Sequence, residues 1–330
     1  MPLRTRHYLM SLALLPAVAA ADVPSVAVDI PPVHSLVKRV MGELGSPDLV
    51  IQPGASPHGY SMRPSEASAL DRADVVFWVG AGLTPWLAES IETLADDAVS
   101  VELMDVPVTR KLEYRQGATF EPHDHGDHDH DHDHDHDHDH DHDHDHDHDH
   151  DHDHGHSHEG TNPHGWLDPV NAQVWLDAIA DSLAKLDPDN AVTYRENARL
   201  GKADLAALTD ELQAQLADAR EARFIVFHDA YQYFENRFGI SAAGAISLGD
   251  ASKPSPARID ELRNLAGELD IDCVFSEPQY NPALVESVFG DSGVNTSIVV
   301  DPLGTELSLG EQLYPDLLHH LADAVTRCGS

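Results

Sequence analysis

Strand-like and helix-like segments alternate along this chain, and that alternation limits its possible folds more than any other feature. Short apolar runs typical of buried strands lie at residues 26–30, 48–51, 74–80, 99–106, 224–228, 240–246, 272–276 and 296–301. Segments with helical spacing lie between them, and several begin with a proline, which suits a first helical turn. Because helical crossovers cover both faces of a parallel sheet, we expect an α/β fold.

A tract of alternating histidine and aspartate, residues 121–159, interrupts this pattern. It contains 18 His, 15 Asp and 2 Glu, and no large hydrophobic side chain that could enter a core. Burial therefore cannot offset an ordering cost of about 1–2 kcal/mol per residue. We expect the tract to be a disordered loop inserted in a folded domain.

Two predicted helices follow the tract and divide the chain. The first begins at Pro169, after the N-cap candidate Asp168, and the second begins at Asp187-Pro188. The second runs for some 30 residues, which at 1.5 Å per residue gives a length of about 45 Å. A helix of that length suits a rigid connection between two lobes. We predict an N-terminal α/β lobe at 22–186, a linking helix at 187–219 and a C-terminal α/β lobe at 220–330, each lobe with a mainly parallel sheet.

The first 21 residues have the pattern of an export signal. Arg4 and Arg6 precede a mostly apolar run at 8–20, and small residues at 17–21 provide cleavage sites. The run is too short for a bilayer, which takes about 20 apolar residues. The alternative is a buried N-terminal helix. No cysteine follows the run, so we expect no lipid anchor and a soluble mature protein in the periplasm.

The net charge of −38 comes partly from the tract, whose 17 carboxylates leave −21 for the rest of the chain. An acidic chain of this kind argues against nucleic acid and anionic lipid as partners, and it favours cations.

Six histidines lie outside the signal and the tract, and three of them occupy positions typical of ligand sites. His58 lies in the loop after the second predicted strand, His164 lies just before a helix, and His228 ends a strand. Asp301 ends another strand. Ligands of open α/β sheets bind at the carboxyl ends of strands. Because two of these residues come from each half of the chain, we expect them to meet in the cleft between the lobes.

Three imidazoles and one carboxylate form a four-ligand set suited to tetrahedral Zn²⁺, whereas replacing one imidazole by a carboxylate would favour manganese. The alternative for each histidine alone is a surface or core residue. The tract adds weak, exchangeable sites, whose affinity we expect near micromolar, against near nanomolar for the cleft. Its candidate ligands include His123, His125, His128, His130, His132, His154, His156 and His158. The alternative is a solvated acidic linker.

Other residues are weaker candidates. Cys273 and Cys328 are the only cysteines in the sequence. Export allows them to form a disulfide that would tie the last helix to a strand. The alternative, a pair of metal-binding thiols, is disfavoured because no CxxC spacing is present. Glu277 ends a predicted strand and is either a support for a ligand or a surface carboxylate. His34 is a candidate for the cleft wall. We expect a packing role for Trp166 and solvated side chains for His319 and His320. Arg63 either orients a ligand loop or forms a surface ion pair, and we favour the surface ion pair.

Four stretches resemble one family. PGASPHGYSMRPS (53–65), NPHGWLDP (162–169), FIVFHDAYQYF (224–234) and VVDPLGTEL (299–307) are similar to the zinc-uptake periplasmic substrate-binding proteins of ABC transporters, ZnuA type, in metal-binding cluster A-I. The resemblance covers about residues 24–328. Manganese-binding relatives typically have Glu where His228 stands. One departure is the His/Asp tract, which is unusually long and regular.

The resemblance has several implications. It implies that His58, His164 and His228 bind Zn²⁺. It implies that Asp301 is the fourth ligand, which in this family can be replaced or joined by water or a loop carboxylate. It also implies that Cys273 pairs with Cys328. It also implies a monomeric carrier whose partners are a membrane permease and a periplasmic zinc chaperone.

Three function classes remain in competition at the level of sequence. The leading one is a carrier that holds Zn²⁺ and performs no chemistry. The second is a zinc hydrolase, because three histidines with an open fourth position also form a catalytic pattern, with Glu277 as the candidate general base. The third, supported only by the tract, is an adhesin or a metal-storage protein.

Overall fold

The computed structural model describes residues 23–115, 120, 160–247, 255–290 and 293–329. The predicted export signal and the predicted His/Asp loop with its weak metal sites lie outside the described residues. Among the helices that are described, none is long and apolar enough to cross a membrane.

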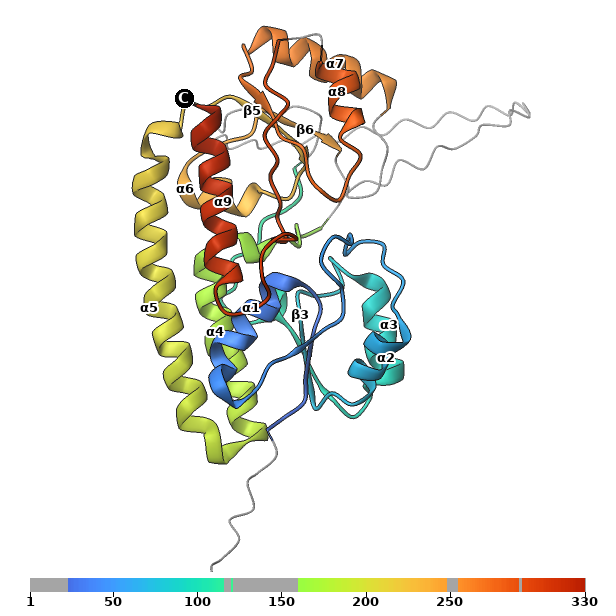
Figure 1. Ribbon diagram of the computed structural model, residues 1–330, viewed down its shortest axis with the longest axis vertical. Coiled ribbons are helices and arrows are strands. Elements are labelled where there is room, and N and C mark those ends of the chain that lie inside the picture. The colour runs from blue at the N-terminus through green and yellow to red at the C-terminus, as the bar shows by residue number, and fades with distance from the viewer. Residues whose placement is uncertain (1–22, 116–119, 121–159, 248–254, 291–292, 330) are drawn as a thin grey trace, which may run out of the picture.

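The N-terminal lobe is built on a four-stranded parallel sheet with the order β2-β1-β3-β4. Its strands are β1 (Val26–Val28), β2 (Asp48–Leu49), β3 (Val75–Trp78) and β4 (Val99–Glu102). Its helices are α1 (Pro31–Met41), α2 (Pro64–Asp71), α3 (Pro85–Leu94) and α4 (Pro169–Leu186), with 3₁₀ turns η1 (Gly42–Leu44), η2 (Leu103–Asp105) and η3 (Gly165–Leu167). Figure 1 shows α1 and α4 on one side of β3 and α2 and α3 on the other. The β1 and β3 side chains are buried because helices cover both faces of the sheet.

The C-terminal lobe has a three-stranded parallel sheet with the order β6-β5-β7. Its strands are β5 (Phe224–His228), β6 (Gly244–Ser247) and β7 (Cys273–Val274). Its helices are α6 (Gln232–Phe238), α7 (Pro256–Glu268), α8 (Ala283–Phe289) and α9 (Leu313–Cys328). The expected strand at 296–301 is instead an extended segment that pairs with the sheet only through isolated bridges at Asn295 and Val299.

A long helical segment connects the lobes, as predicted. It consists of η4 (Pro188–Asn190), α5 (Ala191–Gln215) and η5 (Leu216–Ala219). Helix α5 contacts α1, α4 and α9, and Figure 1 shows it running along one side of both lobes. Gly201 allows close packing here, because a Cβ atom at this position would lie 3.0 Å from Leu176 Cδ1. The two α/β lobes and the long helix confirm the expected fold class, whereas the exact lobe boundaries remain a prediction.

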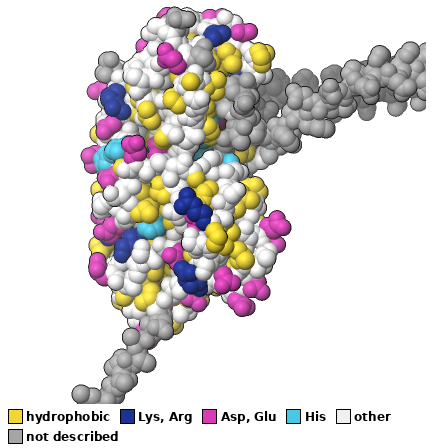
Figure 2. All heavy atoms as spheres, turned by 45° about the vertical axis from the view of Figure 1, so that its right-hand side comes forward, with side chains coloured by type: hydrophobic (Ala, Val, Ile, Leu, Met, Phe, Trp, Pro, Cys, Tyr) yellow, Lys and Arg dark blue, Asp and Glu magenta, His cyan; other side chains and the backbone are white. Residues whose placement is uncertain are grey.

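Two further features hold the arrangement together. The predicted disulfide between Cys273 and Cys328 is confirmed, with a Cα–Cα distance of 5.8 Å, and it ties α9 to β7. Between the lobes, the Trp166 indole donates to Pro302 O over 2.8 Å and the Tyr314 hydroxyl donates to Trp166 O over 2.6 Å. On the face shown in Figure 2, acidic side chains are scattered over both lobes with basic side chains among them.

Candidate metal centre

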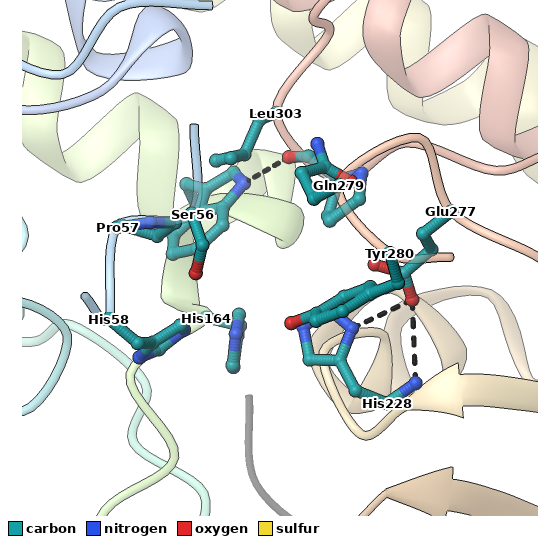
Figure 3. A pocket seen from close by; sticks show the side chains of 11 residues that line it. Ser56, Pro57, His58, His164, His228, Glu277, Gln279, Tyr280 and Leu303 are labelled. Carbon is teal, nitrogen blue, oxygen red and sulfur yellow. Dashed lines mark hydrogen bonds and ion pairs between the residues drawn. The ribbon is translucent and has the colours of Figure 1, made fainter. Parts of the chain in front are cut away.

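The three histidines singled out in the sequence line one small cavity between the lobes (Figure 3). His58 lies on the loop between β2 and α2 and is half-buried, His164 precedes η3, and His228 is the last residue of β5. His164 and His228 are 2% and 4% exposed. The ring of His164 lies 5.7 Å from that of His58 and 5.4 Å from that of His228, measured between centroids. The chain therefore brings together residues up to 170 positions apart, as the sequence predicted.

These spacings are somewhat longer than those of ligands that share an ion. Two imidazoles bound to one tetrahedral Zn²⁺, with Zn–N bonds of about 2.0–2.1 Å, have ring centres about 5 Å apart. The cavity leaves about 10 Å³ for the centre of a water-sized sphere, which is room for about one water molecule or one ion. As the side chains stand, no three His, Cys, Asp or Glu residues in the described part of the chain are gathered closely enough to hold an ion. Ligation therefore requires small rotations or a closer approach of these rings.

Two buried side chains orient the imidazoles. Glu277 Oε1 lies 2.7 Å from His228 Nδ1, and Asn162 Oδ1 lies 2.8 Å from His164 Nδ1. A hydrogen-bond acceptor at Nδ1 fixes the proton on that nitrogen, so that Nε2 can bind a metal ion. Metal-bound histidines are usually supported in this way. The support role is therefore the one that the structure favours for Glu277, which is 2% exposed and lines the cavity. Sequence reasoning missed Asn162, although its place two residues before His164 was an available signal.

Asp301, the predicted fourth ligand, is engaged elsewhere. Its Oδ1 accepts hydrogen bonds from Gln279 Nε2 over 2.8 Å and from the Leu303 amide over 2.9 Å, and its Oδ2 accepts from the Thr305 amide. Gln279 and Leu303 line the cavity, and Asp301 is not among the lining residues. The carboxylate thus already accepts three hydrogen bonds, and its role as a ligand remains a prediction.

Aromatic side chains complete the walls. Trp166 is buried with its ring 5.1 Å from that of His164, which agrees with the packing role expected for it. The rings of Tyr280 and His228 meet edge to face, with their centroids 5.6 Å apart. Burial raises the pKa of Tyr231 well above its usual value, and the charges of Glu277 and Asp301 raise it further. Tyr231 therefore stays a neutral phenol beside the site.

The weaker candidates lie away from the cavity. His34 is buried on α1 and does not line it, and burial lowers the pKa of this imidazole. Arg63 is exposed at the N-cap position of α2, where its amide donates to Glu66 Oε2 over 2.6 Å. On α9, His320 is exposed, but His319 is half-buried rather than solvated.

Comparisons with known proteins identify the family of the chain. The family described as "Zinc-uptake complex component A periplasmic" matches residues 26–328. The chain belongs to this family. Its relatives include the high-affinity zinc uptake system proteins ZnuA of Paracoccus denitrificans, 47% identical over 97% of this chain and 95% of that protein, and of Brucella abortus, 46% identical over 94% and 92%.

Solved structures of the zinc-uptake family and its neighbours share the fold. A crystal structure of ZnuA has a TM-score of 0.73 at 21% identity and covers 94% of this chain and 100% of that one. The periplasmic zinc binding protein TroA from Treponema pallidum has a TM-score of 0.71 at 18% identity, with 93% and 99% covered. The zinc-uptake family is named for a periplasmic transport component and is not an enzyme family.

Proposed function

We propose that this protein captures Zn²⁺ in the cleft between its lobes and delivers it to an ABC-type importer for zinc uptake. The observation that carries the proposal is the convergence of three imidazoles from distant parts of the chain on a cavity that has room for one ion. Its relatives support the proposal: they are named zinc uptake proteins, and the match covers nearly the whole length of both sequences.

The proposed ligands are Nε2 of His58, His164 and His228, with Asp301 as the fourth. The Nδ1 contacts of His164 and His228 support this assignment, because they leave Nε2 to face the cavity. A set of three imidazoles and one carboxylate favours zinc over manganese.

A carrier is favoured over a hydrolase by the surroundings of the site. A hydrolase needs a general base beside a metal-bound water. Glu277, the sequence candidate for that base, holds His228 Nδ1 at 2.7 Å and so is committed to orienting a ligand. We therefore propose that the protein binds and releases the ion without chemistry.

We further propose that the protein works in the periplasm as a monomer, with the permease of the importer and a periplasmic zinc chaperone as its partners. The charged, apolar and small-residue order of residues 1–21 supports export. Light scattering of the mature protein would test the monomer. Zinc transfer from a loaded chaperone, measured without the permease, would test the second partner.

Zinc competition against a chromophoric chelator tests the ligand assignment. We expect His58→Ala, His164→Ala and His228→Ala each to weaken the tightest zinc event at least tenfold. His320→Ala, an exposed position on α9, is the matched control and should leave it unchanged. Native affinity in all three cavity variants would overturn the proposal.

A further inference from the structure

Two segments between the lobes pair with each other in antiparallel fashion, and we call them the strap: residues 110–115 and 160–162 (Figure 1). The Tyr114 amide donates to Gly160 O over 3.1 Å, and the Asn162 amide donates to Leu112 O over 2.8 Å. A bridge between Glu113 and Thr161 lies between these bonds. The first segment follows η2 and the second precedes η3, so by sequence both belong to the N-terminal lobe.

The strap is nevertheless fastened to the C-terminal lobe, through helix α6. The buried Tyr233 hydroxyl accepts from the Leu112 amide over 2.9 Å and donates to Asn162 O over 2.8 Å, and so holds both segments. The Arg110 guanidinium donates to Asn236 Oδ1 over 2.6 Å. These bonds fasten the strap to the second lobe, while the backbone of Arg110 is also held by Asn171 on α4 of the first lobe.

The strongest attachment is the ion pair of Arg115 with two buried carboxylates. Its guanidinium donates to both oxygens of Asp229 over 3.0–3.1 Å and to the two oxygens of Glu235 over 2.7 and 3.0 Å. The three side chains are 10%, 2% and 4% exposed. Asp229 directly follows His228, so Arg115 holds the chain at the point where β5 presents its ligand. Burial lowers the pKa of the Arg115 guanidinium, and the two carboxylates more than offset this, so the net shift is upward.

The same strap carries His164. Asn162 Oδ1 accepts from the His164 amide over 3.0 Å and faces His164 Nδ1 at 2.8 Å. Asn162 Nδ2 donates to Asp229 O over 3.3 Å and to Gln232 Oε1 over 3.0 Å. His164 and His228 are thus supported by one hydrogen-bonded body, whereas His58 lies on the loop between β2 and α2 of the other lobe.

We propose that Arg115 is a positioning residue for zinc binding, which holds His164 and His228 as a preformed pair by fastening the strap to Asp229 and Glu235. The inference rests on the proposed function. The ring spacing of 5.4 Å in this pair, close to the value of about 5 Å for shared zinc ligands, is what such support would maintain. Ordering two ligands in advance lowers the entropic cost of capturing an ion, and His58 then joins as the third.

Zinc affinity of Arg115 variants tests the proposal. Loss of a group that supports a ligand costs about 10–100-fold in metal affinity, so we expect a weakening of that size in Arg115→Ala. Arg115→Lys should recover part of it, because lysine keeps the charge but not the forked geometry. Arg237→Ala is the matched control: Arg237 lies on α6, the helix that carries Glu235, and pairs with the buried Asp168 over 2.7 Å rather than with Asp229. It should stay near native affinity.

A double-mutant comparison separates positioning from general stability. Arg115→Ala should weaken zinc binding by the whole expected factor in a His58→Ala background and by clearly less in a His228→Ala background, where only His164 is left for the strap to position. The visible spectrum of bound Co²⁺ should change in Arg115→Ala, because the ligand geometry differs. Should Arg115→Ala fail to fold with two unpaired carboxylates, Arg115→Ala/Asp229→Asn/Glu235→Gln removes the three charges together and should fold with the same weakened affinity.

Two outcomes would overturn the inference. One is native zinc affinity in the folded Arg115 variants while His228→Ala has lost it, which leaves the proposed function intact. The other is an equal weakening by Arg115→Ala in both histidine backgrounds, which indicates a purely structural role. Native affinity in His228→Ala would instead refute the proposed site itself.

Discussion

Replacing Glu277 should weaken zinc binding although this residue is not a proposed ligand. Its carboxylate lies 2.7 Å from His228 Nδ1, is 2% exposed and also accepts from the His228 amide over 3.4 Å. Removing such a support typically costs about 10–100-fold in metal affinity, which corresponds to about 1.4–2.8 kcal/mol. Glu277→Gln keeps an oxygen acceptor and should lie near the lower end, whereas Glu277→Ala removes the acceptor and should lie near the upper end.

Competition with a chelator of known zinc affinity measures both variants in one buffer. Glu268→Gln, an exposed carboxylate on α7, is the control and should bind zinc as the native protein does. Thermal unfolding without metal must show that the variants are folded. Native zinc affinity in a folded Glu277→Ala would refute the reasoning that Glu277 orients a ligand.

Three further predictions concern the rest of the chain. Replacing both Cys273 and Cys328 by serine should lower the free energy of unfolding by about 4 kcal/mol, because the disulfide closes a 55-residue separation; denaturant unfolding measures this. Deleting residues 121–159 should leave the tight zinc event intact, because the tract has no core residue, and calorimetry that shows its loss would contradict this. Burial raises the pKa of Asp29 from 3.8 to about 7, so its contribution to stability is present below pH 3.8 and is lost as the pH rises to about 7. Asp29→Asn should therefore lose less stability than the native protein over this window, as unfolding at a series of pH values would show.

The sequence placed three histidines where the structure has them, along one cavity between the lobes, because their positions follow local patterns. His228 ends a buried apolar strand and His164 precedes a helix with Asp168 as its N-cap, and such positions place ligands at the edge of a sheet. The disulfide needed only the redox compartment and a count of two cysteines.

Other features depend on contacts that no local pattern encodes. Arg115 reaches Asp229 across 114 residues, and nothing in its own neighbourhood marks it as more than a surface cation. Asp301 ends an apolar run, as expected, but the fold around it provides two backbone amides and Gln279 as partners. The segment at 296–301 is apolar enough for a strand, yet it forms only isolated bridges because it lies at the margin of a three-stranded sheet.

The central claim is that the two lobes bring three imidazoles to one Zn²⁺. A crystal structure of the zinc-loaded protein, with anomalous scattering recorded at the zinc edge, tests it most directly. The account predicts one strong peak in the cleft, at about 2.0–2.1 Å from Nε2 of His58, His164 and His228. A zinc peak elsewhere, with those three rings too far apart to share an ion, would contradict it.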